Sequence, residues 1–530
     1  MTDFYQLTMC YAYWKCGKSE QEAVFDLYFR TPPFDGEYTI FCGLEEALKY
    51  INAFKFSAAD IEFLKTRMKD CEPEFFDYLG KLDCSKVKAY AIREGSVVFP
   101  SVPLIRIEGP LAVSQLLETT LLTLVNFSSL VATNAARYRV AADSSSKKGI
   151  VLLEFGVRRA QGPDGGMSAS RYAYIGGFNG TSNVAAAQSF NISVKGTHAH
   201  SFVTSFTGLQ ELKNFSTILR NKNTGKDEDL ARIAMGFREK VNFDEFGKAD
   251  ASNNGEFVSF VAYAVSFPNN FLALVDTYNT MKSGLLNFVV VALALHEFGY
   301  KAIGVRLDSG DLAYLSKKSR ELFRLAGERF KVDYFEKLKI CGSSDLDEEV
   351  LYSLNTQGHE IDIFGIGTNL VTCKGTPALG CVYKLVSIGG KPRIKLSNNL
   401  KKVTLPGRKE AYRLVGKDGP ILDLLIEVGA EPPQVGQLVE CRHPFDGTKR
   451  CKVKPSAIIP LHQLVWDGKF VGKKYSLNEI REFCLSEMNS LRSDHKYHTK
   501  PTPYKVSLSV GLSGIFQNLW LQESPVEEIN

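Results

Sequence analysis

The sequence contains no Cys-x-x-Cys pair and no strong excess of charge of either sign. Its eleven cysteines are odd in number and scattered along the chain, which indicates reduced thiols rather than a disulfide framework. The formal net charge of +5 over 530 residues is too small to indicate nucleic acid as a main partner. We therefore expect a cytosolic protein that uses its basic residues locally, where they can receive an anionic ligand.

Long hydrophobic runs are absent as well. The most apolar stretch, Leu285–Leu295, is interrupted by Asn287 and is well short of the ~20 residues that cross a bilayer. We expect a buried helix there and no association with a membrane. The opening residues, MTDFYQLTMCYAYW, lack a charged segment followed by an apolar core, so we also expect no signal peptide.

What the chain does have is the composition of a globular protein, with 44% hydrophobic and 23% charged residues and a length that fits about three domains. Residues 1–112 mix helix and strand patterns and predict an α+β domain. Residues 381–530 are rich in strand patterns, including KKVTL at 401–405. A helix is expected to begin at Ser476, where Glu479 three residues later completes the signature of a capping box.

Between these parts the pattern alternates strand, loop and helix. The run IVLLEF at 150–155 is typical of a strand buried on both faces. Alternating strands and helices indicate a parallel sheet, and residues 113–380 match the length of a closed barrel, about 250 residues. We therefore predict an α/β fold class with an irregular barrel rather than a doubly wound sheet. The expected strands are 150–155, 192–194, 270–275, 302–305, 337–341 and 361–364.

Two histidines stand out in the stretch VKGTHAHSFVTSF at 194–206. His198 and His200 are two residues apart, so in extended backbone both imidazoles point to the same side and would face one site. Three interpretations are open. The pair binds a metal ion, one histidine acts as a nucleophile or base, or both are ordinary loop histidines with satisfied hydrogen bonds.

Charged residues collect where the predicted strands end, which is where barrel proteins keep their active sites. Arg158, Arg159 and Arg306 are suited to carboxylate or phosphate oxygens, although surface ion pairs are the alternative for any one of them. Asp276 and Asp308 are suited to Mg²⁺ or to a cationic sugar carbon, and helix capping is the alternative for both.

The last two strand ends are built from small residues, Gly342–Asp345 (GSSD) and Gly365–Thr368 (GIGT). Small residues before a helix leave backbone N–H groups free to surround an anion, and the helix dipole favours it. The loops after strands seven and eight are a common phosphate site in barrels, and tight turns are the alternative explanation. The residues alone thus indicate a barrel for a phosphorylated, anionic substrate, and they do not name the reaction.

Several long motifs extend over nearly the whole chain: TDFYQLTM, LLETTLLTLVNFSSLVATNAAR, GVRRAQGPDGG, YIGGFNGTSNV, GT-x-AHSFVTSF, GVRLDSGDL and FGIGTNLVT. They closely resemble motifs of the eukaryotic nicotinate phosphoribosyltransferase family. The resemblance implies a type II phosphoribosyltransferase-like fold, in which the C-terminal portion packs partly on the N-terminal domain, and a homodimer with a shared active site. It also implies ATP-coupled transfer of phosphoribosyl from phosphoribosyl pyrophosphate to nicotinate, with Mg²⁺ (or Mn²⁺) as cofactor.

The resemblance assigns roles to individual residues. His200, in the AHS part of its motif, would be the phosphorylated residue. Tyr5 would stack on the nicotinate ring from the partner subunit. By resemblance to the related nicotinamide enzymes, Phe155 would stack on the opposite face of the ring. Thr197 and Arg306 would contact nicotinate, with Arg306 pairing with its carboxylate.

The resemblance places phosphoribosyl pyrophosphate at the same mouth. Its 5′-phosphate would be held by Thr368 and the GIGT backbone at Gly365 and Gly367. By resemblance to the related nicotinamide enzymes, the residues that would line the ribose and pyrophosphate are Arg158, Asp276 and Asp308.

Other functions stay open on the sequence. His198 occupies a position where the resemblance implies an apolar residue, which leaves open whether it shares the phosphohistidine role of His200. The alternatives are a nicotinamide-specific relative, a metallohydrolase that uses the two histidines, and a non-catalytic binding protein. Cys441, His443 and Cys451 are one ligand short of a zinc site, so ordinary structural roles are favoured for them.

Overall fold

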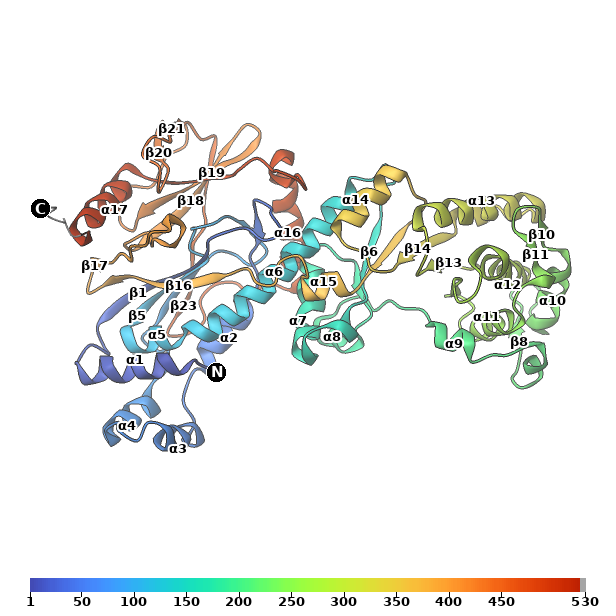
Figure 1. Cartoon of the computed structure of the whole chain (residues 1–530), viewed down its shortest axis with the longest axis horizontal. Helices are drawn as coiled ribbons and strands as arrows, with labels where there is room; N and C mark the ends of the chain where they lie inside the picture. The colour runs from blue at the N-terminus through green and yellow to red at the C-terminus, as the bar shows by residue number, and fades with distance from the viewer. Residues whose placement is uncertain (525–530) are drawn as a thin grey trace, which may run out of the picture. The chain divides into compact units, whose positions relative to one another are not determined.

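The computed structural model describes residues 1–524, which form two compact units (Figure 1). The first unit contains Met1–Ala136, Ile175–Gly177 and the chain from Cys373 onward. The second contains Arg137–Tyr174 and Phe178–Thr372. The two ends of the sequence therefore belong to one unit, and the units begin and end elsewhere than the expected boundaries at residues 112 and 380.

One sheet of the first unit combines strands from both ends of the sequence. Its order is β17 (Lys391–Pro392), β16 (Cys381–Ile388), β1 (Glu22–Phe29), β5 (Ile105–Pro110), β3 (Lys88–Ala91) and β23 (Gln463–Asp467). β1 is buried along nearly its whole length and pairs antiparallel with β5 on one side and with β16 on the other (Figure 1). Strands from the C-terminal part of the chain, β16, β17 and β23, thus complete the sheet that β1 centres.

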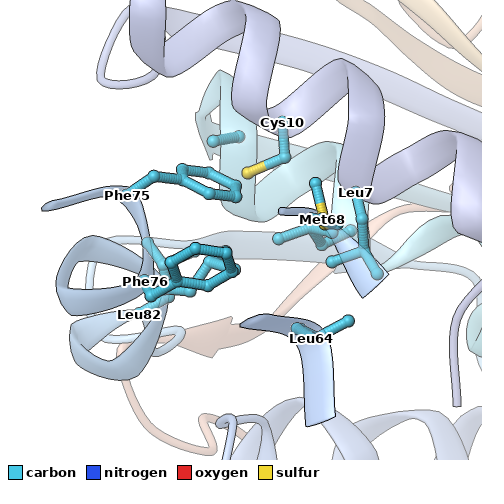
Figure 2. Packing of buried hydrophobic residues seen from close by; sticks show 10 residues of the cluster. Leu7, Cys10, Leu64, Met68, Phe75, Phe76 and Leu82 are labelled. Atoms are coloured by element: carbon cyan, nitrogen blue, oxygen red, sulfur yellow. The ribbon is translucent and has the colours of Figure 1, made fainter. Parts of the chain in front are cut away.

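A layer of helices packs on this unit through an apolar cluster. The helices involved are α1 (Phe4–Lys15), α3 (Ala58–Arg67), α4 (Pro73–Lys81) and α5 (Leu111–Leu116). Figure 2 shows Cys10 of α1 pointing toward Phe75 of α4, while Leu7 lies beside Met68. Phe4 and Tyr5, on the first turn of α1, lie outside this cluster and are 56% and 49% exposed. The cluster thus fixes α1 while leaving two aromatic side chains at its start uncovered.

The strand-rich C-terminal portion forms a second sheet. Its order is β21 (Arg450–Val453), β20 (Val439–Arg442), β24 (Lys505–Leu508), β19 (Gly419–Glu427), β18 (Lys409–Gly416) and β22 (Ala457–Pro460). The expected capping box is confirmed, because Ser476 and Glu479 cap α16 (Leu477–Ser490) reciprocally. The strand expected at KKVTL is wrong. Asn399 accepts a hydrogen bond from the backbone N–H of Lys401 and starts a 3₁₀ turn there instead.

Apolar helices follow β5 along the chain. α5 is followed directly by α6 (Glu118–Asp143), and together they form a stretch long and apolar enough to cross a membrane by length and composition. Within its apolar window, 61% is buried inside the protein, as in the core helix of a globular domain. The other apolar stretch, Leu285–Leu295, is buried throughout, as expected.

The second unit is built on a parallel sheet. Its order is β12 (Leu272–Leu274), β13 (Gly304–Leu307), β14 (Lys339–Ser343), β15 (Ile363–Ile366), β6 (Val151–Glu154) and β7 (Gly180–Thr181). Five of the expected strands are confirmed to within two residues at either end. The helices around it are α7 (Gly162–Ile175), α8 (Val184–Phe190), α9 (His200–Thr204), α10 (Leu230–Lys240), α11 (Asn254–Ser266), α12 (Leu285–Glu297), α13 (Leu312–Phe330), α14 (Glu348–Gln357) and α15 (Thr368–Thr372).

The remaining edge of this sheet is irregular. The strand expected at 192–194 is wrong, because Val194 makes only an isolated bridge with Thr181 of β7. β7 itself, two residues long, was not expected. From Val194 the chain runs toward β12, where the backbone N–H of Leu274 donates to the imidazole of His198 at 3.3 Å. These contacts connect the β7 edge to β12 without a backbone ladder, so the barrel is irregular.

Candidate active site

The parallel strands of the second unit end at one edge, and the predicted polar residues gather there. Asp276 comes after β12, Asp308 after β13 and Phe155 after β6, while Ser343 is the last residue of β14. Neighbouring strand ends are in register, with Ser343 opposite Gly365 of β15. Segments far apart in the sequence therefore present their side chains at a common mouth.

Arg306 is held in place by hydrogen bonds to the next two strand ends. Its Nε donates to Ser343 Oγ at 2.7 Å, and its Nη2 donates to Asp308 Oδ1 at 2.8 Å. The Ser343 hydroxyl donates in turn to the same oxygen of Asp308. Nη1 of Arg306 has no hydrogen-bond partner among residues 1–524. A guanidinium that is oriented on two sides and open on the third is suited to a ligand carboxylate.

Asp276 has one oxygen bound and one free. Its Oδ2 accepts hydrogen bonds from the backbone N–H of Asp308, at 3.1 Å, and from the hydroxyl of Ser309. Its Oδ1 is buried and has no hydrogen-bond partner in the described part of the chain. An unpartnered buried carboxylate oxygen is costly unless a ligand, ion or water occupies it. Asp276 is therefore suited to a hydroxyl group or a cation of a bound substrate.

His200 lies between Thr277 and the two aspartates. Its Nδ1 is 3.0 Å from Thr277 Oγ1, within hydrogen-bond distance. Its Nε2 is 3.7 Å from Asp308 Oδ2 and 4.0 Å from Asp276 Oδ1, too far for a hydrogen bond to either. The side chain is 43% exposed. Nε2 is thus the nitrogen that faces the mouth and is open to react.

His198 does not share this site. Its Nε2 accepts the Leu274 N–H, and its ring packs against Phe202, Phe260 and Tyr263. Burial lowers its pKa to about 4, so the imidazole is neutral at physiological pH. The expectation that both histidines face one site is wrong. The extended backbone ends at Ala199, and His200 already lies in the first turn of α9.

Phe155 forms an apolar wall beside Arg306, whose guanidinium carbon lies 5.5 Å from the centre of the ring. The ring needs the missing side chain of Gly365, because a Cβ there would lie 2.4 Å from two of its carbons. Gly156 is equally constrained, since a Cβ would lie 2.4 Å from Val371 of α15. Both glycines therefore permit close packing of the β6 and β15 ends.

The GIGT loop leads from β15 into α15, which starts at Thr368. Thr368 is half-buried, and a Cβ on Gly367 would meet only ordinary contacts, the nearest at 3.4 Å. First-turn amides lack partners inside a helix, which suits this loop to an anion.

Four predicted residues are placed without contacts to this cluster. Arg158 and Arg159 lie in an exposed 3₁₀ turn after β6, and their side chains have no ion-pair or hydrogen-bond partner among the residues that the structure describes. Thr197 is half-buried, and its hydroxyl donates to the carbonyl of His198 at 3.4 Å. Tyr5 belongs to the first unit, on the exposed start of α1.

Sequence reasoning assigned no role to the hydroxyl groups that hold the charged residues. Thr277 contacts His200, Ser309 contacts Asp276, and Ser343 joins Arg306 to Asp308. Each is a strand end or follows one of the predicted charged residues directly. The pattern of a hydroxyl residue immediately after a strand-end aspartate, as in Asp276-Thr277 and Asp308-Ser309, is the signal that points to them.

The donor set at the mouth can accommodate Mg²⁺. The described residues contain no group of three or more His, Cys, Asp or Glu side chains placed to hold a metal ion. Mg²⁺ does not require such a cage, because it commonly binds through one or two carboxylates together with substrate phosphates. The free Oδ1 of Asp276 fits that role. Cys441 and Cys451 face each other across β20 and β21 as free thiols, with no metal cluster around them in the described chain.

Three family models match the sequence. They are the nicotinate phosphoribosyltransferase N-terminal domain over residues 1–126, the nicotinate phosphoribosyltransferase family over residues 150–415, and the C-terminal domain over residues 408–515. Together they cover most of the chain.

Individual proteins match over most of their length. The nicotinate phosphoribosyltransferase of Dictyostelium discoideum is 53% identical, over 100% of this chain and 89% of its own. The nicotinate phosphoribosyltransferase of Homo sapiens is 44% identical, over 99% of this chain and 97% of its own. The crystal structure of human nicotinic acid phosphoribosyltransferase matches with a TM-score of 0.87 and 42% identity, covering 98% of this chain and 100% of that one.

Proposed function

The chain belongs to the nicotinate phosphoribosyltransferase family, and from this premise we propose that it joins nicotinate to phosphoribosyl pyrophosphate. The products are nicotinate mononucleotide and pyrophosphate, a step of NAD biosynthesis. The observation that carries this assignment is the meeting of Arg306, Phe155, Asp276 and His200 at the mouth of one barrel.

Nicotinate fits the part of the site between Phe155 and Arg306. A flat pyridine ring would stack on Phe155, and its carboxylate would accept from the unoccupied Nη1 of Arg306. Thr197 would contact the same base from the Val194–His200 segment. Tyr5 would close the other face of the ring from a partner subunit.

Phosphoribosyl pyrophosphate fits the neighbouring strand ends. Its 5′-phosphate would lie on the backbone of Gly365 and Gly367 and on Thr368, where α15 begins. The exposed, unpaired guanidinium of Arg158 would meet the pyrophosphate. Asp276 and Asp308 would hold the ribose hydroxyls and the Mg²⁺ (or Mn²⁺) ion, which when bound neutralises charge on the pyrophosphate.

The reaction requires mainly positioning and charge stabilisation. The pyridine nitrogen forms a bond with C1 of the ribose while the bond from C1 to the pyrophosphate oxygen breaks. Positive charge develops on the sugar during this exchange, so the carboxylates of Asp276 and Asp308 would stabilise it. Holding both reactants at one mouth supplies the rest of the rate enhancement.

We infer that His200 couples the reaction to ATP hydrolysis. Its Nε2 attacks the γ-phosphorus of ATP, a P–N bond forms, the bond to the bridging oxygen breaks and ADP leaves. Thr277 supports this role because it occupies Nδ1 and leaves Nε2 toward the mouth. The phosphoryl group adds negative charge beside the substrate and would hold the site closed until pyrophosphate leaves.

A homodimer would complete the site. Phe4 and Tyr5 are large, exposed apolar side chains at one end of α1, and a second copy of the chain would cover them. We expect this dimer in the cytosol, since all eleven cysteines are free thiols.

Product analysis with purified protein tests the proposal. Nicotinate, phosphoribosyl pyrophosphate and Mg²⁺ are supplied with and without ATP, and nicotinamide replaces nicotinate in parallel. We expect nicotinate mononucleotide, made faster with ATP, and acid-labile label from γ-labelled ATP in the native chain but not in His200→Ala. Equal or better use of nicotinamide would overturn the assignment, and label retained in His200→Ala would overturn the role of His200.

A further inference from the structure

Among the described residues, 1–524, no strand pairs with one edge of β12. Its other edge pairs with β13, where the N–H of Val275 donates to the carbonyl of Arg306. Successive amides of a strand point to opposite sides, so the N–H of Leu274 points away from β13. In the part of the chain that the structure describes, the acceptor on that side is an imidazole nitrogen, His198 Nε2 at 3.3 Å.

The surroundings of His198 fix this imidazole in one protonation state. A nitrogen that accepts a hydrogen bond carries no proton, so Nε2 is bare and the ring is neutral. The ring lies among Phe202, Phe260 and Tyr263, with centroid separations of 5.4, 6.2 and 4.8 Å. Burial is the largest cause of the lowered pKa of His198, and the positive charge of Arg306 also disfavours a second proton, although a hydrogen bond with the backbone of Ala199 acts in the opposite direction. The acceptor is therefore present throughout the physiological pH range.

The same segment makes a second contact two residues later. His200 Nδ1 lies 3.0 Å from the hydroxyl of Thr277, which follows Leu274 by three residues. The chain between Val194 and His200 has one isolated bridge to Thr181, and Lys195 N–H donates to the carbonyl of Thr181 at 2.9 Å. The side chains of His198 and His200 thus attach the segment from Val194 to His200 to β12 and to the loop after it. No backbone ladder makes this connection in the described part of the chain.

We propose that His198 is a positioning residue, whose imidazole replaces a missing strand at the free edge of β12 and fixes the segment that carries Thr197 and His200. The phosphoryl acceptor is held at the mouth through this attachment. The consequence for catalysis rests on the proposed function, while the attachment itself does not.

Three substitutions separate the hydrogen bond from packing. His198→Leu keeps an apolar side chain among the aromatic rings and removes the acceptor. His198→Gln keeps an acceptor, the amide oxygen, and is the rescue variant. His359→Leu is the matched control, because His359 is also buried and accepts a backbone N–H, that of Ile361 at 3.1 Å, but before β15.

Amide hydrogen exchange reads the attachment directly. In His198→Leu we expect exchange in peptides containing Leu274 and residues 194–204 to rise about tenfold, the scale of one lost buried hydrogen bond. His198→Gln should restore part of the protection, and His359→Leu should leave these peptides unchanged. Protection at Leu274 equal to that of the native chain in His198→Leu would overturn the proposal, whether or not the protein makes nicotinate mononucleotide.

Kinetics read the consequence for His200. With ATP, His198→Leu should lower kcat about tenfold and slow acid-labile labelling, with a smaller change in the KM for nicotinate. Without ATP the variant should differ less from the native enzyme, because His200 is then not phosphorylated. An equal loss with and without ATP, or the same loss in His359→Leu, would contradict the positioning role. If His198→Leu does not fold, His198→Ala replaces it and is compared with His198→Gln. The exchange rates and kcat of His198→Gln must then lie nearer to those of the native chain than the values of His198→Ala, and the reverse order would overturn the proposal.

Discussion

Arg306 Nη2 donates to Asp308 Oδ1 at 2.8 Å, so the cation of the site is anchored to a carboxylate two residues away before any ligand binds. Ser343, from the next strand, contacts both groups and fixes their geometry. The remaining donor, Nη1, gains a partner only from a ligand that brings an acceptor of its own. Discrimination between an anionic and a neutral base is therefore expected to lie in Arg306.

Arg306→Lys tests this relationship. An ammonium group cannot hold Ser343 and Asp308 and still offer a directed donor, because it lacks the planar fork of the guanidinium. We expect kcat/KM for nicotinate to fall about 100-fold and the preference over nicotinamide to fall with it, the scale of one lost charge-assisted contact. Steady-state kinetics with both bases measure this.

The control for this change is Arg324→Lys, on the exposed face of α13. Arg324 pairs there with Glu328 at 2.7 Å, an arrangement that contributes little when exposed. It should leave both kcat/KM values unchanged. An unchanged preference for nicotinate in Arg306→Lys would show that the base is recognised elsewhere.

Gly365→Ala should displace Phe155. The added Cβ would lie 2.4 Å from two ring carbons, so the ring must move away from Arg306. We expect kcat/KM for nicotinate to fall at least about tenfold and the protein to lose about 1–3 kcal/mol of stability, as in other overpacked sites. Kinetics and thermal unfolding measure the two effects.

A double substitution shows whether the clash is the cause. In Phe155→Ala the ring is absent, so adding Gly365→Ala should cost little further stability, and the two changes should not be additive. Gly236→Ala is the control, because Gly236 lies in α10 with open space where its Cβ would be. Additive losses in the double variant would exclude the ring as the source of strain.

The barrel strands could be predicted because each carries its own signal. The run at 150–155 is apolar at every position except Glu154, and β6 occupies its centre. β7 gave no such signal, and the pattern at 192–194 predicted a strand where the structure has one isolated bridge. Pairings of one or two residues are defined by their partners, here Leu153 and Thr181. Long-range pairing of this kind is not encoded in a local pattern.

The charged residues of the site could be predicted from the sequence, but the directions in which its two histidine side chains point could not. Asp276 and Asp308 stand out at strand ends, and the structure places the backbone N–H of one on the carboxylate of the other. The spacing of His198 and His200 indicated a shared face, but a helix that begins at His200 turns the second ring away. Where a backbone changes from extended to helical depends on the packing of Phe202 against His198, which the sequence pattern does not contain.

Lys409→Met should destabilise the first unit. Lys409 of β18 pairs with Asp26 of β1 at 2.6 Å, and both side chains are almost fully buried. Removing the cation leaves a buried carboxylate uncompensated, which typically costs about 3–5 kcal/mol. The midpoint of thermal unfolding should be lower in Lys409→Met than in the native chain. Combining Asp26→Leu with Lys409→Met should restore much of the lost midpoint temperature. The exposed pair of Lys65 and Glu62 supplies the control, Lys65→Met, whose midpoint should stay at the native value.

Glu256 gives the second unit a pH dependence. This buried carboxyl on α11 accepts hydrogen bonds from Ser283, at 2.5 Å, and from Asn287, at 3.0 Å. Burial, with a smaller contribution from Asp276, raises its pKa to about 7. The folded protein therefore keeps a proton that the unfolded chain releases near its ordinary value of 4.5. It follows that this group lowers stability as the pH rises from 4.5 to 7.

Glu256→Gln should remove that loss. The amide stays neutral at every pH and keeps an oxygen that accepts from Ser283, so the variant should gain on the native chain by up to about 3 kcal/mol between pH 4.5 and 7.5. Thermal midpoints of both proteins, measured across this range, show the gain as a difference that grows with pH. The contributions of other titrating groups cancel in that difference. The control is Glu239→Gln, on the exposed side of α10, whose thermal midpoint should not differ from that of the native chain in a way that grows with pH. A difference that stays constant, or shrinks as the pH rises, would mean that Glu256 is ionised in the folded protein at pH 5.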